Sequence, residues 1–430
     1  MDNLFPAELK ARLDEIGAAD LVVGIPSYNN VRTIPHVVRA VVAGLAKYFP
    51  ERRAILVNSD GGSKDGTQQA VLEAQVDTEA LLQVAHPVQP LQRISTPYDG
   101  VPGKGSAFRT IFAVAKRLNA KACIVVDSDL RSINPDWVEL LARPILDRDF
   151  DYVAPFYLRH KYDGTITNGI IYPLTRTLFG KRIRQPIGGD FGFSGRLAAR
   201  YLEKDVWNSD VARFGVDIWM TVTAIAEGFR VSQAYLGAKL HDAKDPGADL
   251  TSMFCQVVGS LFSLLETYAS VWQHTNGSEA VPMFGFPFEV SVEPIAVNVE
   301  RMMKGFVQGV TDLRDIYQTF LSHGTLSGLA DCAAPRDDFH FPDRLWVHLI
   351  YEFAAAWHAR ELDREHLLQS LVPLYLGRTA SFVLETRESS AREVEQRMEQ
   401  LCEVFEGEKP YLEELWNQLS KKEMSHAASD

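Results

Sequence analysis

Cysteine is scarce in this chain of 430 residues, and no uninterrupted apolar run reaches the length of about 18 residues that a membrane-spanning helix needs. The four cysteines lie far apart and form no CxxC pair, which argues against a zinc site or a disulfide framework and favours a reducing, cytoplasmic location. The most apolar stretch, 253–272, is interrupted by polar residues such as Gln256 and Glu266. We therefore expect a buried helix there and no integral membrane segment.

Positive charge is also in short supply, since the formal net charge is −12. The chain as a whole is therefore a poor partner for nucleic acid, although a local basic pocket for phosphate is compatible with this balance. The first ten residues lack the basic segment and the apolar run of a signal peptide. We expect no nucleic-acid partner.

The alternation of strand-like and helix-like segments indicates the fold class. Short apolar runs at 21–26, 53–58 and 122–126 alternate with helical patterns. Strands that read as continuous apolar runs between helices predict a parallel sheet covered on both faces. Further along the chain the pattern changes to long helices. We expect an α/β, Rossmann-like catalytic domain with a mostly parallel sheet over residues 1–250, and a mainly helical domain over 251–430.

A D-x-D motif, Asp127-Ser128-Asp129, directly follows the apolar run 122–126. At a strand end its carboxylates lie at the mouth of the sheet, where hard oxygen ligands suit Mg²⁺ or Mn²⁺. Such a metal bridges two phosphates and stabilises a leaving diphosphate. Taken alone the motif is weak, because Asp127 in a simple turn or helix cap would satisfy backbone amides equally well.

Three further loops sit where the carboxyl ends of the strands should be, at the ligand-binding edge of such a sheet. They are Pro26-Ser27-Tyr28-Asn29-Asn30, the segment 59–67 with Asp60 and Gly61, and Gly103-Lys104-Gly105-Ser106. Glycines let backbone approach a ligand closely, and Lys104 near a helix start is well placed to meet phosphate. The alternative for each loop is a tight turn with ordinary caps. Neither a Walker A spacing nor a Rossmann G-x-G-x-x-G is present.

The order of these four motifs resembles the nucleotide-sugar half of GT-A glycosyltransferases. The resemblance covers about residues 21–130. It implies a GT-A fold and a donor that is a UDP-, GDP- or ADP-hexose. The donor-binding positions that it implies, from base and ribose to phosphate, are Pro26, Tyr28, Asn30, Asp60, Gly61, Lys104, Asp127 and Ser128.

A narrower resemblance continues through Gln185–Asp190, Phe214–Ile218 and Leu236–His241. The series is similar to the retaining family that contains glucosyl-3-phosphoglycerate synthase and glucosylglycerate synthase. It implies a metal site of Asp129 and His241, touched by Asp127, that holds Mg²⁺ or Mn²⁺. It also implies catalytic or sugar-orienting roles for Ile187, Asp190 and Asp217, and an acceptor site with Thr167, Gly188 and Gly189.

One departure from that family bears on the acceptor. Members that use phosphoglycerate hold the acceptor phosphate with an Arg in a G-R-V-T segment and an Asn two residues after the metal histidine. Here these positions are Thr165 and Ala243. Losing a cation and an amide weakens the case for a phosphorylated acceptor. We expect a metal-dependent hexosyltransferase that moves glucose or mannose, with retention, to a small hydroxy acid such as D-glycerate or to 3-phosphoglycerate.

Two other functions remain open at this point. An inverting, family 2-like transferase for a lipid or polysaccharide would need a carboxylate base, for which Asp190 or Asp217 is the candidate. A non-catalytic sugar-nucleotide binding protein is the other, and the intact D-x-D and Lys104 argue against it. The apolar helix expected over 344–351 is either intramolecular core or a homodimer face.

Overall fold

The computed structural model describes residues 5–74, 92–97, 103–240, 251–286, 295–335 and 338–427. The chain divides into two compact units. An α/β unit comprises Met1–Arg159, Ile183–Asp242 and Ala280–Glu293, and a helical unit comprises His160–Arg182, Ala243–Glu279 and Pro294–Asp430. This division differs from the boundary expected at residue 250, because 160–182 belongs to the helical unit and 280–293 to the α/β unit.

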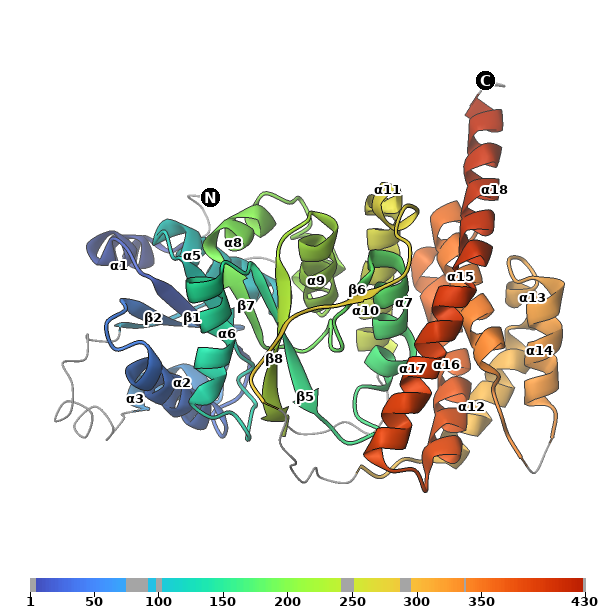
Figure 1. Ribbon diagram of the computed structural model, residues 1–430, viewed down its shortest axis with the longest axis horizontal. Helices are drawn as coiled ribbons and strands as arrows, with labels where there is room; N and C mark the ends of the chain where they lie inside the picture. The colour runs from blue at the N-terminus through green and yellow to red at the C-terminus, as the bar shows by residue number, and fades with distance from the viewer. Residues whose placement is uncertain are drawn as a thin grey trace. The chain divides into compact units, whose positions relative to one another are not determined.

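An eight-stranded sheet forms the centre of the α/β unit, in the order β10-β8-β5-β7-β4-β1-β2-β3 (Figure 1). The strands are β1 (Leu21–Ser27), β2 (Ala54–Asp60), β3 (Gln92–Pro97), β4 (Ala122–Val125), β5 (Tyr152–Leu158), β7 (Phe191–Ser194), β8 (Val231–Ala238) and β10 (Met283–Phe284). All neighbouring strands run parallel except β7, which is antiparallel to β4 and β5. The expected mostly parallel sheet with flanking helices is confirmed.

Helices cover both faces of this sheet. Alternate residues of β1 point to opposite faces, so Leu21 and Val23 join the apolar core under α2 (Ile34–Tyr48) and α6 (Asp136–Arg148). Gly24 faces the other side, where a Cβ would press within 2.5 Å of Ile111 in α5. A strand buried on both faces has to be apolar throughout, which is why β1 reads as one continuous run.

The other helices of the α/β unit are short. They are α1 (Ala7–Ile16), α3 (Thr67–Glu73), α5 (Lys104–Arg117), α8 (Gly195–Leu202), the 3₁₀ helix η2 (Asp210–Ala212) and α9 (Val216–Ala226). Both α5 and α9 begin at loops on the carboxyl side of the sheet, and this places their first turns beside the strand ends that carry the motifs.

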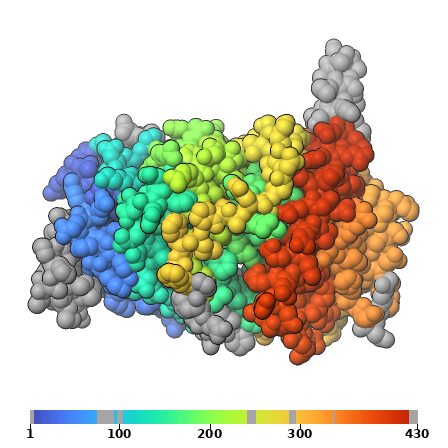
Figure 2. Space-filling model, in the orientation of Figure 1, coloured from blue at the N-terminus to red at the C-terminus, as the bar shows by residue number. Residues whose placement is uncertain are grey.

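The helical unit is built almost entirely from helices that pack through apolar stripes. Its elements are the π-helix η1 (Thr167–Ile171), α7 (Tyr172–Phe179), α10 (Thr251–Thr267), α11 (Ala269–Trp272), α12 (Val299–Asp312), α13 (Arg314–Tyr317), α14 (His323–Ala333), α15 (Asp343–Ala359), α16 (Arg364–Thr386), α17 (Ala391–Gly407) and α18 (Lys409–Ala427), with the short strands β6 (Lys181–Arg182) and β9 (Glu279–Ala280). In Figure 2, α17 and α18 form the red surface of this unit.

Close helix contacts explain two glycines of the helical unit. A Cβ on Gly309 of α12 would overlap Pro373 of α16, and a Cβ on Gly377 of α16 would come within 2.5 Å of Phe306 of α12. By length and composition, α16 is the one helix in the described part of the chain that qualifies as a membrane span, with a mean hydropathy of 1.2. However, 67% of its most apolar stretch is buried inside the structure, as in the core helix of a folded unit.

Candidate active site

The D-x-D turn follows β4 and is fixed by the loop after β1. The Ser128 hydroxyl donates to Asn30 Oδ1 at 2.8 Å, and the Thr33 hydroxyl donates to the Ser128 carbonyl at 2.8 Å. Ser128 is buried, whereas Asp127 and Asp129 on either side of it are half-buried. Ser128 therefore holds the turn, and the two carboxylates face the more open side.

In the loop after β1, some side chains anchor the loop to its neighbours and one is exposed to solvent. Asn30 Oδ1 also accepts from the Tyr28 amide at 2.9 Å, and the Asn30 amide donates to Thr67 at 2.8 Å. Pro26 is buried within β1. Tyr28 is 64% exposed, which leaves its ring available to a ligand. Of the three expected donor-binding residues here, Tyr28 is the one open to solvent.

Asp60 organises the loop after β2. Its carboxylate accepts from the hydroxyls of Ser27 and Ser63 at 2.8 and 2.6 Å, from the amides of Gly62 and Ser63 at 3.0 and 2.8 Å, and from Gln68 Nε2 at 2.8 Å. Burial acts to raise the pKa of Asp60, but the hydrogen bonds outweigh it and hold the pKa below its ordinary value. A base contact at Asp60 would have to displace one of these donors.

The adjacent Gly61 is likewise part of the loop framework. Its amide donates to the Ser27 carbonyl at 2.8 Å, so the loops after β1 and β2 are joined by backbone as well as by side chains.

Five charged residues form an active-site cluster where these loops meet: the buried Asp190, Asp217 and Lys239 and the half-buried Lys104 and Asp127. Lys104 Nζ lies 2.8 Å from Asp127 Oδ1 and 3.5 Å from Asp217 Oδ1. Lys239 Nζ lies 2.8 Å from Asp127 Oδ2 and 2.9 Å from Asp190 Oδ2. Both Asp127 oxygens are thus bound by lysines. The sequence predicted four of these residues, and the structure brings them together.

Lys239 was missed by the sequence analysis. It follows β8 directly and its side chain is 4% exposed. The signal was a lone lysine inside the apolar stretch 235–240, because a lysine is almost never buried unless it is paired. Its partners come from distant parts of the chain, which no local pattern reveals.

The P-I-G-G-D segment wraps around Asp127. A Cβ on Gly189, where φ is +89°, would overlap Asp127 Oδ2, and a Cβ on Gly188 would overlap Pro155. The two glycines therefore permit close contact between protein segments. Ile187, at the start of the loop, is half-buried.

Asp190, for which the resemblance implies a catalytic or sugar-orienting role, is fully buried. Its Oδ1 accepts from the Asp127 amide at 2.8 Å, and its Oδ2 accepts from Lys239 and from the Tyr157 hydroxyl. Both oxygens are occupied by the protein. Asp190 joins the D-x-D turn to β5 and has no surface left for a substrate.

Asp217 lies in the first turn of α9 and is 8% exposed. Among the described residues, no group donates a hydrogen bond to its Oδ1, which has only the longer contact to Lys104. Burial is the largest influence and raises the pKa of Asp217. An incompletely paired carboxylate oxygen is costly to bury and marks a place for a ligand hydroxyl.

The opposite charges in the cluster stabilise each other in their ionised forms. Burial acts to raise the pKa of Asp127, but Lys104 and Lys239 lower it to well below its ordinary value. Burial acts to lower the pKa of Lys104, and the attraction of Asp127 and Asp217 raises it well above its ordinary value. Both lysines and Asp127 are therefore charged at neutral pH.

The G-K-G motif places Lys104 at the first position of α5. A Cβ on Gly103 or Gly105 would overlap the carbonyl oxygens of Ala212 and Val211. The Gly105 amide donates to the Arg213 carbonyl at 3.2 Å. These glycines let η2 pack against the start of α5, rather than admitting a ligand to the backbone as the sequence suggested.

The expected metal ligand His241 lies outside the described residues. Leu240, which precedes it, accepts from the Arg131 amide at 2.9 Å and donates to Ser132 at 2.9 Å. The end of β8 is therefore tied to the D-x-D turn. Across the residues that the structure describes, no three His, Cys, Asp or Glu side chains are grouped as a ready metal site.

The expected acceptor residue Thr167 belongs to the helical unit, where it is buried at the start of η1. Thr165, at the position of the family's arginine, shares a 2.5 Å hydrogen bond with the Tyr375 hydroxyl of α16. Gly188 and Gly189, the other expected acceptor residues, belong to the α/β unit.

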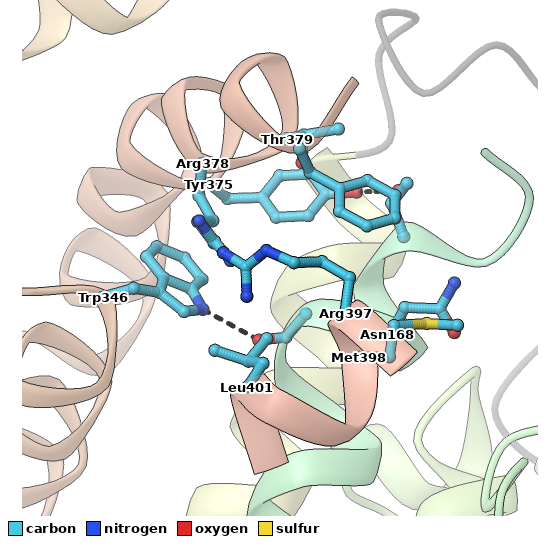
Figure 3. Close-up of a pocket in the computed structure, with 11 residues that line it drawn as sticks. Asn168, Trp346, Tyr375, Arg378, Thr379, Arg397, Met398 and Leu401 are labelled. Carbon is cyan, nitrogen blue, oxygen red and sulfur yellow. Dashed lines mark hydrogen bonds between the residues drawn. The ribbon is translucent and has the colours of Figure 1, made fainter. Parts of the chain in front are cut away.

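A small cavity within the helical unit is lined by residues of η1, α15, α16 and α17 (Figure 3). Arg378 and Arg397 are among the lining residues (Figure 3), and both donate to Asp343 Oδ1 at 2.7 Å. Its volume is about 30 Å³, room for about two water molecules. It is far too small for a hexose or a nucleotide.

Comparison with known proteins gives one family match. The sequence model of the family described as "Mannosylglycerate synthase, GT domain" matches residues 33–263. That span contains Lys104, the D-x-D motif and the residues of the loop 187–190, together with Asp217, Lys239 and His241. No curated protein matches the sequence.

Solved structures with a similar arrangement include glucosyl-3-phosphoglycerate synthase from Mycobacterium tuberculosis. Its complex with Mn²⁺, UDP-glucose and phosphoglyceric acid has a TM-score of 0.43 at 20% identity, over 60% of this chain and 83% of that one. Its complex with Mg²⁺ and UDP has a TM-score of 0.42 at 20% identity, over 61% of this chain and 85% of that one.

Proposed function

The chain belongs to the mannosylglycerate synthase glycosyltransferase family, and from this premise we propose that it transfers a hexose from a nucleoside diphosphate hexose to D-glycerate with retention. The observation that carries the proposal is the active-site cluster. Within the family-matched span, two lysines and three aspartates converge, and one carboxylate oxygen is left without a hydrogen bond.

Lys104 is the residue that we assign to the donor diphosphate. It begins α5, a helix of 14 residues whose N-terminus favours anions, and its side chain is 19% exposed. Its longer contact to Asp217 is the one that a phosphate oxygen replaces most easily. The ammonium group then stabilises the charge that grows on the leaving diphosphate.

Asp129 and His241 are the residues that we assign to a divalent metal, Mg²⁺ or Mn²⁺. Asp129 is the carboxylate of the D-x-D turn that the resemblance to the family assigns to the metal, and carboxylate oxygens suit a hard cation. His241 is the metal histidine that the resemblance implies, and it lies within the span that the family model matches. When bound, the metal supplies positive charge for the diphosphate.

Asp217 and the loop 187–190 orient the reacting groups in this proposal. The unpartnered oxygen of Asp217 accepts a hydroxyl of the sugar or of glycerate, and the Ile187 carbonyl helps to orient them. The bond between the anomeric carbon and the phosphate oxygen breaks as the bond to a glycerate oxygen forms on the same face. The hydroxyl proton passes to the leaving phosphate, so no protein base is required. Asp190 acts by positioning Asp127.

An unphosphorylated acceptor fits the residues at the family's phosphate-binding positions. Thr165 replaces the arginine, and its hydroxyl is engaged by Tyr375 within the helical unit. Ala243 replaces the asparagine. Neither side chain offers a charge for a phosphate, so glycerate is favoured over 3-phosphoglycerate.

A turnover screen tests the proposal. UDP-, GDP- and ADP-linked glucose and mannose are crossed with D-glycerate and 3-phosphoglycerate in Mn²⁺ or Mg²⁺, and release of nucleoside diphosphate is measured. Release that depends on glycerate is expected. Release that requires phosphoglycerate would overturn the acceptor assignment, and hydrolysis of the donor without dependence on either acceptor would overturn the acceptor class.

A further inference from the structure

We infer that Lys239 is a positioning residue that holds the D-x-D turn against the loop 187–190, and so keeps the diphosphate and sugar parts of the active site in register. The inference rests on the proposed function, since it concerns how that site is held together. Neither the family's motifs nor the local sequence pattern assigns a role to this lysine.

Three contacts use the full hydrogen-bonding capacity of the Lys239 ammonium group. It donates to Asp127 Oδ2 at 2.8 Å, to the Gly188 carbonyl at 2.7 Å and to Asp190 Oδ2 at 2.9 Å. An ammonium group has three donors, so each one is committed to the protein. At 4% exposure the side chain has no free donor for a substrate.

Lys104 provides the contrast on the other side of the same carboxylate. Its side chain is 19% exposed, and within the described part of the chain its ion pairs are those to Asp127 and Asp217. The two lysines therefore have different roles. Lys104 is placed to replace its contact with a carboxylate by one with a phosphate, whereas Lys239 remains bound to Asp127 and Asp190 when the donor binds.

A cation is required at this point because two carboxylates are brought together. The Asp127 amide donates to Asp190 Oδ1 at 2.8 Å, which draws the Asp190 side chain against the turn. Gly189 approaches so closely that any Cβ would overlap Asp127 Oδ2, the oxygen that Lys239 binds. Without the ammonium group, Asp190 would keep no cation and Asp127 only Lys104, and the repulsion between the two carboxylates would push the loop away from the turn.

Lys239 with its three contacts forms a clamp between the D-x-D turn and the loop 187–190. Tyr157 of β5 connects this clamp to the core. Its hydroxyl donates to Asp190 Oδ2 and lies 3.3 Å from the Gly188 carbonyl, and Lys239 Nζ lies 5.1 Å from its ring centre. Its ring packs on Trp137 of α6, with ring centres 5.6 Å apart. Tyr157 thus fixes the position of the loop 187–190 against a rigid part of the sheet. Catalysis requires such fixed positions for the groups that orient the reacting atoms.

Loss of the clamp should reduce sugar transfer more than it reduces hydrolysis of the donor. Transfer needs the sugar and acceptor side aligned with the diphosphate side, whereas slow hydrolysis of the donor needs only the diphosphate side and water. We expect Lys239→Met to lower kcat for transfer by about 100-fold, the scale of a misplaced reacting group. Donor hydrolysis should fall by less than about tenfold, so that the ratio of hydrolysis to transfer rises.

The experiment compares Lys239→Met and Lys239→Arg with wild type and with Lys121→Met. Lys121 is a matched control, because it also pairs with an aspartate, at 2.9 Å from Asp20, but is 64% exposed. For each protein we would record the thermal midpoint, kcat and KM for donor and acceptor, and hydrolysis without acceptor. The arginine variant keeps the charge and should recover at least about tenfold of the lost transfer.

The outcomes separate this inference from the proposed function. Wild-type protein that transfers to another hydroxyl acceptor but not to glycerate would refute the proposed acceptor, and the ratio of hydrolysis to transfer, measured with that other acceptor, would still test the role of Lys239. An active wild type with an unchanged ratio of hydrolysis to transfer in folded Lys239→Met would overturn the inference. If that variant does not fold, Lys239→Gln, which removes the charge but keeps a hydrogen-bond donor, takes its place, and an unchanged ratio there would also overturn the inference.

Discussion

Two buried charge clusters, one in each unit, use similar groups in different ways. In the helical unit, two arginines, Arg378 and Arg397, face two carboxylates, Asp343 and Glu385, and every carboxylate oxygen accepts a hydrogen bond, although Arg378 Nε has no hydrogen-bond partner among the described residues. In the active-site cluster, two lysines face three aspartates, and Asp217 Oδ1 has no hydrogen bond from a described residue. A balanced cluster stabilises a fold, whereas an unbalanced one keeps capacity for a ligand.

The strongest test of this contrast is Asp129→Asn, next to the active-site cluster. We expect kcat to fall by about a thousandfold or more, because a metal supplies several kcal/mol and each 1.36 kcal/mol is about tenfold in rate. The thermal midpoint should change little, because the side chain is half-buried at the open side of the turn. Turnover close to wild type would remove Asp129 from the metal site.

Removing a partner from the balanced cluster should act on stability instead. Arg378 is 3% exposed, donates to the Phe341 carbonyl at 2.8 Å and pairs with Asp343 at 2.7 Å. Arg378→Met should lower the free energy of unfolding by about 3 kcal/mol, the lower end for a broken buried pair, because Arg397 still binds Asp343. Denaturant titration measures this. A fall in kcat of the folded protein would contradict a purely structural role.

Asp217→Asn should lower activity without lowering stability, the opposite of the result expected for Arg378→Met. Transfer should fall by about 100-fold if Asp217 orients a substrate hydroxyl. Stability should stay the same or rise by up to about 1 kcal/mol, because an incompletely paired buried carboxylate becomes neutral. The two readouts are kcat and the denaturation midpoint. A marked loss of stability would show that Asp217 is part of the structural framework.

The smallest expected effect is the pH dependence of stability from the balanced cluster. Burial acts to raise the pKa of Asp343, but the hydrogen bonds and charges of Arg397 and Arg378 hold it below its ordinary value of 3.8. A depressed pKa gives stability that is present above about pH 4 and is lost as the pH falls through the folded-state value. Asp343→Asn should therefore flatten the acid limb of a stability curve. An unchanged acid limb would contradict the pairing.

The sequence predicted three of the parallel strands, for a physical reason. The runs 21–26, 53–58 and 122–126 correspond to β1, β2 and β4, since strands buried on both faces must be apolar throughout. It did not predict β7, which has only the four residues Phe-Gly-Phe-Ser and pairs with β4 and β5 over long distances in the sequence.

The sequence predicted the part of the site that is formed by loops at the carboxyl ends of parallel strands. The loops after β1, β2 and β4 meet because the carboxyl ends of parallel strands share one edge, so Asn30, Asp60 and Ser128 were expected near one another. The roles of Asp190 and Lys239 were not predictable, because their burial and partners depend on contacts among three distant segments.

The most direct test of the central claim is an NMR analysis of the product made from D-glycerate and α-linked GDP-mannose or UDP-glucose. A hexosyl glycerate with an α-linkage is predicted, formed only when glycerate is present. A β-linked product would contradict retention and restore a protein base such as Asp217. Failure to form a glycosidic bond to glycerate with any donor that the enzyme hydrolyses would contradict the proposed function itself.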